Sequence, residues 1–464
     1  MFFGRFSRAG LVFVFNRWYN GAQRENGMVV YTSKKGGGYF IRTQVAEGGA
    51  QSQSVIVIDA NKTYQTHWGF GASFTEAAAT VLRDAGEGIA QEAIDALFSR
   101  EGNGYTLGRL HINSCDFASP RRTYVREHDE TLSSFDLSYD KEWIVPLVKA
   151  AERASGGLFL TAAPWSPPAF MKDNADMLRG GKLLKQYYPL WAEYLATYVS
   201  EMRQCGVKIS AINVQNEPEA LQPWESCLYT AQEEGEMIKE LARALVKRGL
   251  DTKIAAVDHN RDILVNRAVN LFADEEVRRL VWGLAYHWYG CARHSNLAKI
   301  HELYPEKRLY LSECCVEYAL KEQEGDPEEL LWRHGERYGR EIIEDFNNYS
   351  EGWIDFNLAL NAQGGPNHVG NYCEAPLMFD GKKLHYLPSY YFIGHFSRFI
   401  RPGAVRLFTA CGEDSMYATA YRNPDGKVVA VVQNEGEART VSMRFGKRVA
   451  ALGLPARSVQ TVLF

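Results

Sequence analysis

The fold is decided by the stretch that runs from LFLTAAP (158–164) through LKQYYPLWAEYLATYVSEMRQ (184–204) to KISAINV (208–214). The first and third segments are short apolar runs of the length of a strand. In the middle segment the apolar residues recur three and four positions apart, which is typical of an amphipathic helix. A strand, a helix and a second strand in this order indicate an α/β protein with a parallel sheet.

The same alternation recurs over most of the chain. Strands are expected at 66–74, 105–113, 158–164, 208–214, 253–257, 281–288, 308–312 and 352–360. Helical periodicity is clearest at 91–100, 184–204, 231–248 and 327–347. Eight strands alternating with helices predict a (β/α)8 TIM barrel. A doubly wound open sheet is the alternative, but Gly69-Phe70-Gly71 after the first strand is not a Gly-rich phosphate-binding loop.

Beyond Pro402 the helical periodicity stops, and short strands separated by turns follow at 405–409, 415–422, 427–434, 438–444 and 458–464. Together with the strands before residue 61, they predict an accessory β-sandwich built from both chain termini. We therefore divide the chain into N-terminal strands of the sandwich (28–65), the catalytic barrel (66–402) and C-terminal strands of the sandwich (403–464).

Residues 1–27 are treated as an N-terminal extension that is either a signal peptide or a start upstream of Met28. The stretch has early arginines and an apolar run at 10–15, but no convincing small-residue cleavage site. The eight cysteines form no C-x-x-C pair. We expect reduced thiols, and with them a cytoplasmic protein rather than a secreted one.

The composition argues against several classes of protein. The 52 Lys and Arg against 56 Asp and Glu give a net charge of −4, without the basic excess of a nucleic-acid-binding protein. No apolar run approaches the ~20 residues of a transmembrane segment. Aromatic residues make up 12% of the chain, which suits either a large core or the apolar faces of sugars. The composition leaves the oligomeric state open.

Two carboxylates directly follow apolar strands of the predicted barrel. The fourth strand is followed by Asn216-Glu217-Pro218, and the seventh runs into Ser312-Glu313. Barrel enzymes carry their chemistry where the strands end. A carboxylate on either strand alone is most simply a helix cap or a surface charge. Two in one barrel match the general acid/base and nucleophile of glycoside hydrolysis.

These residues and the sequence around them resemble the motifs of glycoside hydrolase family 30. This family consists of retaining β-glycosidases and includes the glucosylceramidases. The matching segments run in order from about residue 60 to residue 464. They are GFGASF (69–74), RLHINSCDF (109–117), APWSPP (163–168), HWY (287–289), NLALN (357–361), GGPN (364–367) and GHFS (394–397). The family's fold, a barrel with a β-sandwich from both termini, agrees with the fold predicted from periodicity.

The resemblance implies that Glu217 is the general acid/base and Glu313 the nucleophile. The acid has to be protonated near neutrality, so we expect burial and the charge of Glu313 to raise the pKa of Glu217. When Glu313 becomes a glycosyl ester, that repulsion vanishes and Glu217 can act as a base. Asn216 is similar to the family residue that binds the sugar 2-hydroxyl.

The resemblance also implies further binding residues. Tyr289 would hydrogen-bond the nucleophile, Asp116 and Trp165 would bind the glycone together with Asn371, and Arg109 would be a supporting ion-pair partner. Without the resemblance, Trp165 could be a core residue, Tyr289 a plain barrel tyrosine and Arg109 purely structural.

Several other polar residues lie near these positions. His287 is assigned a supporting role and, like His111, has no metal-ligand spacing, so neither a metal nor an organic cofactor is expected. The role of His259 stays open. Glu219 and Glu317 are expected on the surface or in loops.

Two positions depart from the glucosylceramidase members of the family. Phe356 and His368 stand where those members have tryptophan, so an indole N–H for a sugar hydroxyl is lost. The departures leave the catalytic pair intact but put glucose as glycone and ceramide as aglycone in question.

The expected function is a retaining β-glycosidase, with β-glucosides as leading substrates, either glucosylceramide-like or small oligosaccharides. β-Fucosidase, β-xylosidase or β-1,6-glucanase specificity would use the same chemistry. A catalytically inactive carbohydrate-binding relative is the alternative from another class, and the presence of both glutamates argues against it. A metal-dependent hydrolase would need a His/Asp ligand cluster that the sequence does not show.

Overall fold

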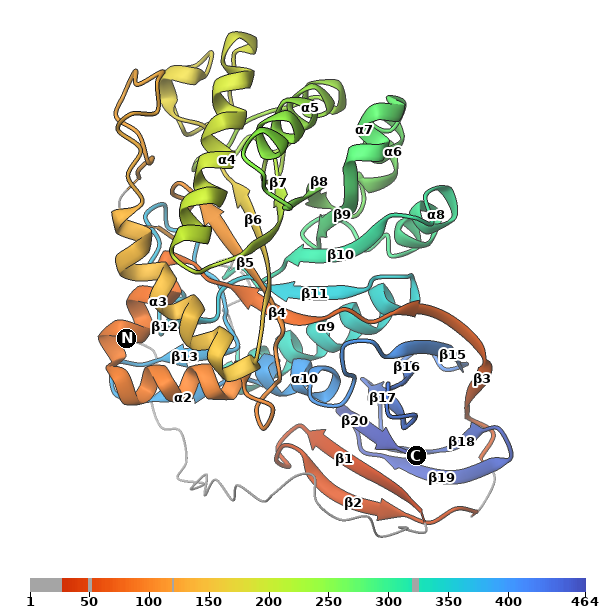
Figure 1. The fold of residues 1–464 in the computed structure, drawn as a ribbon. Helices are drawn as coiled ribbons and strands as arrows, with labels where there is room; N and C mark the ends of the chain where they lie inside the picture. Colours follow the sequence, from red (N-terminus) through yellow and green to blue (C-terminus); the bar gives the residue numbers. More distant parts are fainter. Residues whose placement is uncertain (1–26, 49–51, 119–120, 319–324) are drawn as a thin grey trace.

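A computed structural model describes residues 27–48, 52–118, 121–318 and 325–464 of the chain. The expected N-terminal extension, apart from Gly27, lies outside these residues. The described chain forms a barrel ringed by helices and a β-rich unit that lies beside it (Figure 1).

Eight parallel strands close into a barrel, in the order β10-β11-β4-β5-β6-β7-β8-β9. They are β4 (Gly69–Ser73), β5 (Leu107–Ile112), β6 (Phe159–Pro164), β7 (Ile209–Asn213), β8 (Lys253–Asn260), β9 (Val281–His287), β10 (Arg308–Glu313) and β11 (Gly352–Asp355). The last strand pairs with the first, with Trp353 opposite Phe70. The closed barrel confirms the predicted fold and excludes the open sheet.

Helices bury their apolar faces in the described chain, and all but the last of them connect barrel strands. They are α1 (Glu76–Ala85), α2 (Glu87–Phe98), α3 (Ser138–Ser155), α4 (Tyr188–Gln204), α5 (Ala231–Lys247), α6 (Leu264–Leu271), α7 (Glu275–Leu280), α8 (Ser295–Leu303), α9 (Pro327–Asn347) and α10 (Pro388–Ser397). Local signals fix where several begin: Thr230 and Glu233 form a capping box at α5, and Asp326 caps α9. Helix α4 begins four residues later than predicted, because a short 3₁₀ turn precedes it and Pro189 occupies its first turn.

The two ends of the barrel interior differ in character. At the amino end of the strands, the rings of Trp68, Phe159, Trp282 and Tyr310 pack edge to face and against each other. At the carboxyl end the interior is polar, and Arg109 lies fully buried below it. The apolar plug excludes water from one end, so the polar side chains are reached only from the other.

The β-rich unit joins strands from both chain ends in the order β19-β18-β3-β15-β16-β17-β20-β1-β2. They are β1 (Met28–Lys34), β2 (Ile41–Val45), β3 (Val55–Thr66), β15 (Val405–Cys411), β16 (Met416–Arg422), β17 (Val428–Asn434), β18 (Arg439–Phe445), β19 (Arg448–Leu454) and β20 (Ser458–Leu463). Strand β1 pairs with β20, and β3 with β15. The β-sandwich from both termini is thereby confirmed. Sequence analysis missed β19, whose short apolar run contains a glycine and two small alanines.

Two predicted strands are divided in the structure. Within the stretch 66–74, strand β3 ends at Thr66 and strand β4 begins at Gly69. The stretch 352–360 breaks after Asp355, because Asn357 adopts a left-handed φ of 78° that a strand cannot hold. The chain then enters a separate sheet of β12 (Ala359–Asn361), β13 (Leu377–Phe379) and β14 (Leu384–Tyr386). Among the described residues, no helix is both long enough and apolar enough to cross a membrane.

Candidate active site

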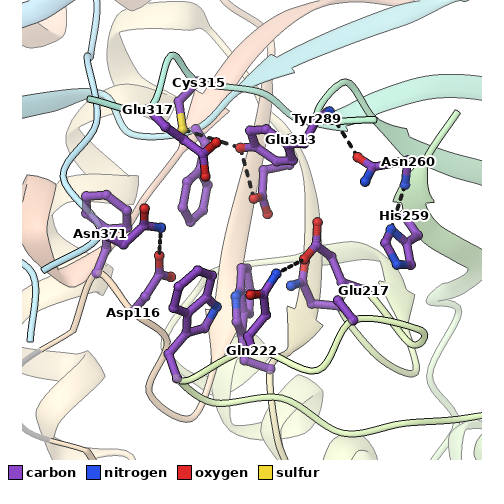
Figure 2. A pocket seen from close by; sticks show the side chains of 16 residues that line it. Asp116, Glu217, Gln222, His259, Asn260, Tyr289, Glu313, Cys315, Glu317 and Asn371 are labelled. Atoms are coloured by element: carbon purple, nitrogen blue, oxygen red, sulfur yellow. Dashed lines mark hydrogen bonds between the residues drawn. The ribbon is translucent and has the colours of Figure 1, made fainter. Parts of the chain in front are cut away.

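A cavity of about 160 Å³ opens at the carboxyl end of the barrel. Each of the strands β5 to β11 is followed by, or ends in, a residue that lines it. The lining residues are Asp116, Phe117, Trp165, Asn216, Glu217, Ala220, Gln222, Trp224, His259, Asn260, Tyr289, Glu313, Cys315, Glu317, Phe356 and Asn371. The predicted contact residues therefore all lie in one cavity (Figure 2), with Arg109 and His287 buried beside the two glutamates.

Glu217 is held by an unusual backbone. Its φ is 46°, in the left-handed region that a glutamate rarely adopts. Its N–H donates to the carbonyl oxygen of Asp258 at 2.9 Å. The neighbouring strand β8 is irregular at this point, since Val257 and Asp258 also have positive φ and its register against β9 shifts there. Strain of this kind persists only where the surrounding structure enforces it.

Glu313 ends β10 and is a buried residue, 6% exposed. The hydroxyl of Tyr289 donates to its Oε1 at 3.1 Å. The guanidinium of Arg109 forms an ion pair with its Oε2. Both of its oxygens are thereby oriented from opposite sides.

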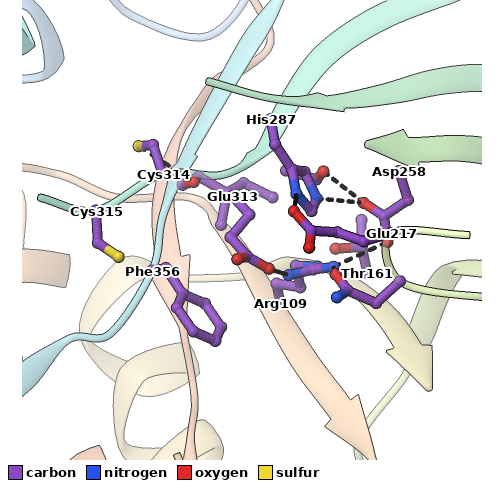
Figure 3. A network of polar contacts seen from close by, with 12 residues as sticks. Arg109, Thr161, Glu217, Asp258, His287, Glu313, Cys314, Cys315 and Phe356 are labelled. Carbon is purple, nitrogen blue, oxygen red and sulfur yellow. Dashed lines mark hydrogen bonds and ion pairs between the residues drawn. The ribbon is translucent and has the colours of Figure 1, made fainter. Parts of the chain in front are cut away.

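A chain of buried polar contacts joins the two glutamates (Figure 3). Arg109 bridges from Glu313 to Asp258, donating from Nη2 to Asp258 Oδ2 at 2.8 Å. The other oxygen of Asp258 lies 3.2 Å from His287 Nε2, and His287 Nδ1 lies 3.1 Å from Glu217 Oε1. Arg109 also donates to Asn216 Oδ1 at 2.7 Å, which orients the asparagine next to Glu217.

The pKa of Glu217 differs from the expectation. Burial by itself would raise the pKa of Glu217, but the hydrogen bond and charge of His287 lower it below its ordinary value. Against its own burial, the pKa of His287 rises to about 9, chiefly through the charge of Glu313 and the contacts with Asp258 and Glu217. Burial raises the pKa of Glu313, with the charge of Glu217 adding to the rise. These shifts favour a proton on His287 over one on Glu217, whereas a raised pKa was expected for Glu217.

One wall of the cavity combines polar and aromatic groups. Asn371 donates to Asp116 Oδ2 at 3.0 Å, while the buried Oδ1 of Asp116 has no hydrogen-bond partner among the residues that the structure describes. Burial and the charge of Glu313 raise the pKa of Asp116 to about 8. The rings of Trp165 and Phe356 stack with centroids 5.9 Å apart. This wall offers a sugar one polar edge and one apolar face.

The two departures occupy different places. Phe356 lines the cavity, as the sequence comparison with family members implies. His368 lies one layer behind it, where its ring contacts the carbonyl of Ala118 at 2.7 Å and the buried carboxylate of Glu225 at 3.2 Å. Of the two substitutions, only Phe356 touches the space that a glycone would fill.

The other side of the cavity surrounds Glu217 with residues that sequence analysis left without a role. Gln222 donates to Glu217 Oε2 at 3.3 Å, and Trp224, His259 and Asn260 continue this wall. Glu317, which was expected on the surface or in a loop, also lines the cavity. It does so because the chain beyond β10 folds back along Cys373, with which it forms a β-bridge.

Sequence analysis missed Asp258 and Gln222 as parts of the site. The carboxylate of Asp258 follows an apolar run on the fifth barrel strand, the same signal that identified Glu217 and Glu313. Gln222 carries no such signal, because it lies in the loop between β7 and α5 and reaches Glu217 only through the loop's path. Glu219, which was expected on the surface or in a loop, has a half-exposed side chain that pairs with Arg267 at 2.6 Å.

The described residues contain no group of three or more His, Cys, Asp or Glu side chains arranged to hold a metal ion. His111 uses its two ring nitrogens on backbone groups of Asn113 and Glu76.

Comparison with known families decides the chain's membership. Residues 67–400 match the model of the glycosyl hydrolase family 30 TIM-barrel domain, and residues 403–462 match that of the family 30 β-sandwich domain. The chain belongs to glycosyl hydrolase family 30. The family resemblance stated from sequence motifs is confirmed, and with it a hydrolase acting on glycosidic bonds.

The chain is similar to proteins that are named for different substrates. It is 30% identical to the lysosomal acid glucosylceramidase of Mus musculus, covering 82% of this chain and 77% of that protein. It is 25% identical to the endo-1,6-β-D-glucanase neg1 of Aspergillus fumigatus, covering 93% of both. The crystal structure of SrfJ from Salmonella typhimurium matches with a TM-score of 0.90 and 34% identity, over 94% of this chain and 99% of that one.

Proposed function

We propose that this family 30 hydrolase is a retaining β-glycosidase that acts by double displacement, with Glu313 as nucleophile and Glu217 as general acid/base. The observation that carries the proposal is the placement of these two buried carboxyl groups in one cavity, joined through Arg109, Asp258 and His287. The partners of each glutamate suit a different chemical role, since Glu313 has cationic and hydroxyl donors and Glu217 has a titratable imidazole.

In the first step, Glu313 attacks the anomeric carbon while the bond to the leaving oxygen breaks. His287 passes its proton to Glu217 across the 3.1 Å contact, and Glu217 delivers it to that oxygen. Asn216, held by Arg109, binds the sugar 2-hydroxyl, where hydrogen bonds strengthen as positive charge develops on the sugar ring.

In the second step, water attacks the anomeric carbon and Glu313 leaves as a carboxylate. Once Glu313 is an ester it carries no charge, so the main factor that raises the pKa of His287 is gone. The His287–Glu217 pair gave its proton to the leaving oxygen in the first step, so Glu217 is now a carboxylate and acts as the base that takes a proton from the water. Two inversions at the anomeric carbon give net retention.

β-Glucosides are the leading substrates, either glucosylceramide-like or small oligosaccharides. Asp116 and Asn371 provide hydrogen-bonding groups for sugar hydroxyls, and Trp165 provides an apolar face. Phe356 provides no N–H, so discrimination at one hydroxyl is relaxed. β-Fucosidase, β-xylosidase or β-1,6-glucanase specificity therefore stands as the alternative, the last favoured by similarity to the Aspergillus glucanase.

The test is a panel of aryl β-glycosides that differ only in the sugar, with the anomeric configuration of the first product read by proton NMR. We expect hydrolysis of at least one member, insensitive to EDTA, with a β-configured product. An α-configured first product would overturn double displacement. Activity abolished by EDTA would favour a metal-dependent hydrolase, and binding without hydrolysis would favour an inactive carbohydrate-binding relative.

A reducing, cytoplasmic location is also proposed. It is supported by the eight cysteines, all of which lie in the described residues as free thiols.

A further inference from the structure

We propose that Asp258 is a positioning residue that fixes the orientation of His287 and thereby keeps a proton available to Glu217. This inference rests on the proposed function, and it assigns a role to a residue that does not line the cavity itself. Asp258 is fully buried at the end of β8, between the strands that carry the two glutamates.

Every oxygen of Asp258 is used to hold the site. Its backbone carbonyl accepts the N–H of Glu217 at 2.9 Å. Its Oδ1 accepts the hydroxyl of Ser312 at 2.6 Å and faces His287 Nε2 at 3.2 Å, while its Oδ2 accepts Arg109 Nη2 at 2.8 Å. One residue thus contacts the neighbours of both glutamates and the backbone of one.

The backbone of β8 is distorted at the same place. Val257 has φ of 73° and Asp258 has φ of 46°, and the pairing of β8 with β9 shifts between Val257 and His259. A β-bulge next to an active site re-aims a side chain. Here the bulge turns the carboxylate of Asp258 toward the barrel axis and its carbonyl toward Glu217.

The carboxylate determines which nitrogen of His287 faces Glu217. An ionised Asp258 can only accept hydrogen bonds, so Nε2 of His287 must carry a hydrogen toward it. The ring is fully buried, and Nδ1 is thereby directed at Glu217. A proton on Nδ1 then lies on the line between the imidazole and the acid/base carboxyl.

The charge of Asp258 also sets how tightly that proton is held. The groups that face His287 are Glu217 in the loop after β7, Asp258 on β8 and Glu313 on β10, with His259 nearby. Arg109 on β5 lies on the far side of Asp258 and keeps it ionised, lowering its pKa together with His287 against the effect of burial. Removing the charge of Asp258 leaves the imidazolium with one fewer buried anion.

The test is Asp258→Asn, which keeps the shape and removes the charge. The shared proton should be lost at lower pH, so the basic limb of kcat/KM should move down by ~1–2 pH units, the size of a lost hydrogen bond to a charged group. The loss of kcat/KM should be at least about tenfold greater for a phenyl β-glycoside than for the 2,4-dinitrophenyl β-glycoside of the same sugar. Dinitrophenolate needs little protonation as it leaves, so hydrolysis of its glycoside should depend less on the proton supply.

Asp262→Asn is the matched control, because Asp262 follows the same strand but does not line the cavity. It should leave both the pH limb and the leaving-group dependence at wild-type values. Ser312→Ala removes one hydrogen bond to Asp258 but keeps its charge, and should shift the limb less than Asp258→Asn does. The proposal would be overturned if the basic limb of kcat/KM for Asp258→Asn lay within ~0.3 pH units of wild type. It would also be overturned if kcat/KM fell equally for the two aryl glycosides.

Nitrogen-15 NMR of wild-type His287, assigned with the His287→Gln variant, tests the same point if Asp258→Asn does not fold. We expect Nε2 to be protonated throughout the pH range of activity. A neutral ring protonated only on Nδ1 would contradict the proposal. Failure of the proposed function itself would look different, because the wild-type enzyme would then hydrolyse none of the aryl glycosides or would invert configuration.

Discussion

The hydroxyl of Tyr289 lies 3.1 Å from Oε1 of Glu313 and 3.3 Å from the sulfur of Cys315. The tyrosine comes from the loop after β9, and Glu313 and Cys315 come from the end of β10. Because Oε2 of Glu313 is held by Arg109, the tyrosine hydroxyl completes the orientation of the carboxylate. The geometry leaves Glu313 little freedom to rotate before it attacks.

Tyr289→Phe should therefore lower kcat/KM by about 10- to 100-fold, the range expected for one hydrogen bond to a charged group. The loss should be similar for good and poor leaving groups, because the hydroxyl acts on the nucleophile and not on the acid. Tyr187→Phe is a suitable control, since its hydroxyl makes an exposed hydrogen bond to Glu130. Unchanged kinetics for Tyr289→Phe would assign the tyrosine a packing role.

Variants of the catalytic pair should behave differently from each other. Glu313→Ala should abolish turnover on every substrate, because no glycosyl-enzyme can form. Glu217→Ala should still react with dinitrophenyl glycosides and then stall, and azide should restore turnover with a β-configured glycosyl azide as product. An α-configured azide from Glu217→Ala would reverse the two roles. In a crystal structure we expect the two carboxyl groups ~5–5.5 Å apart, the separation for retention.

Glycone selectivity should depend on Phe356. In the wild type, kcat/KM for aryl β-D-glucoside should exceed that for the β-D-fucoside or β-D-xyloside by less than ~10³-fold, because a donor to one hydroxyl is absent. Phe356→Trp should raise the preference for glucoside by restoring an indole N–H. A packing defect would instead lower kcat/KM for all three sugars alike. A wild-type preference for glucose above ~10³-fold would contradict this interpretation.

Asp116 should make stability depend on pH. Its pKa is about 8 in the folded protein, because of burial and the charge of Glu313, against 3.8 ordinarily. The folded state therefore binds a proton that the unfolded state releases, and this contribution to stability is lost as pH rises from about 4 through about 8. The asparagine of Asp116→Asn does not titrate. Between pH 5 and pH 8, the free energy of unfolding of wild type should therefore fall by ~1 kcal/mol or more relative to that of Asp116→Asn.

Urea unfolding of both proteins at the two pH values measures this difference. The aspartate-to-asparagine change at exposed Asp425 serves as a control for non-specific effects of charge. A difference between wild type and Asp116→Asn that is constant with pH would show that Asp116 is ionised throughout the range.

The thiols provide a test of the proposed compartment. Seven of the eight cysteines are buried or half-buried, and Cys291 alone among the eight is exposed. Denatured, unreduced protein from its native host should therefore react with eight equivalents of a thiol reagent, and native protein should react fastest at Cys291. Two or more disulfides in non-reducing mass spectrometry would overturn the reducing location.

Local sequence signals predicted the parts of the fold that depend on short-range periodicity. Strands at 158–164 and 308–312 and the helix at 327–347 lie in the structure within about a residue of their predicted bounds. The signals failed where a left-handed residue interrupts an apolar run, as at Asn357, because periodicity does not record backbone angles. The two glutamates that we propose as nucleophile and acid/base were identifiable because each follows an apolar strand.

By itself, the sequence determined the alternation of strands and helices, the joining of both termini in one β-unit and the identity of the residues at the strand ends. Only the tertiary structure decided which of those residues meet and how they are charged. Arg109 and Glu313 are 204 positions apart, and barrel closure alone brings them together. Burial then places Asp258 against His287 and His287 against Glu217, and the charge of Glu313 together with these contacts raises the pKa of the imidazole. Protonation of this kind depends on the summed field of charges from several strands, which no local pattern of residues encodes.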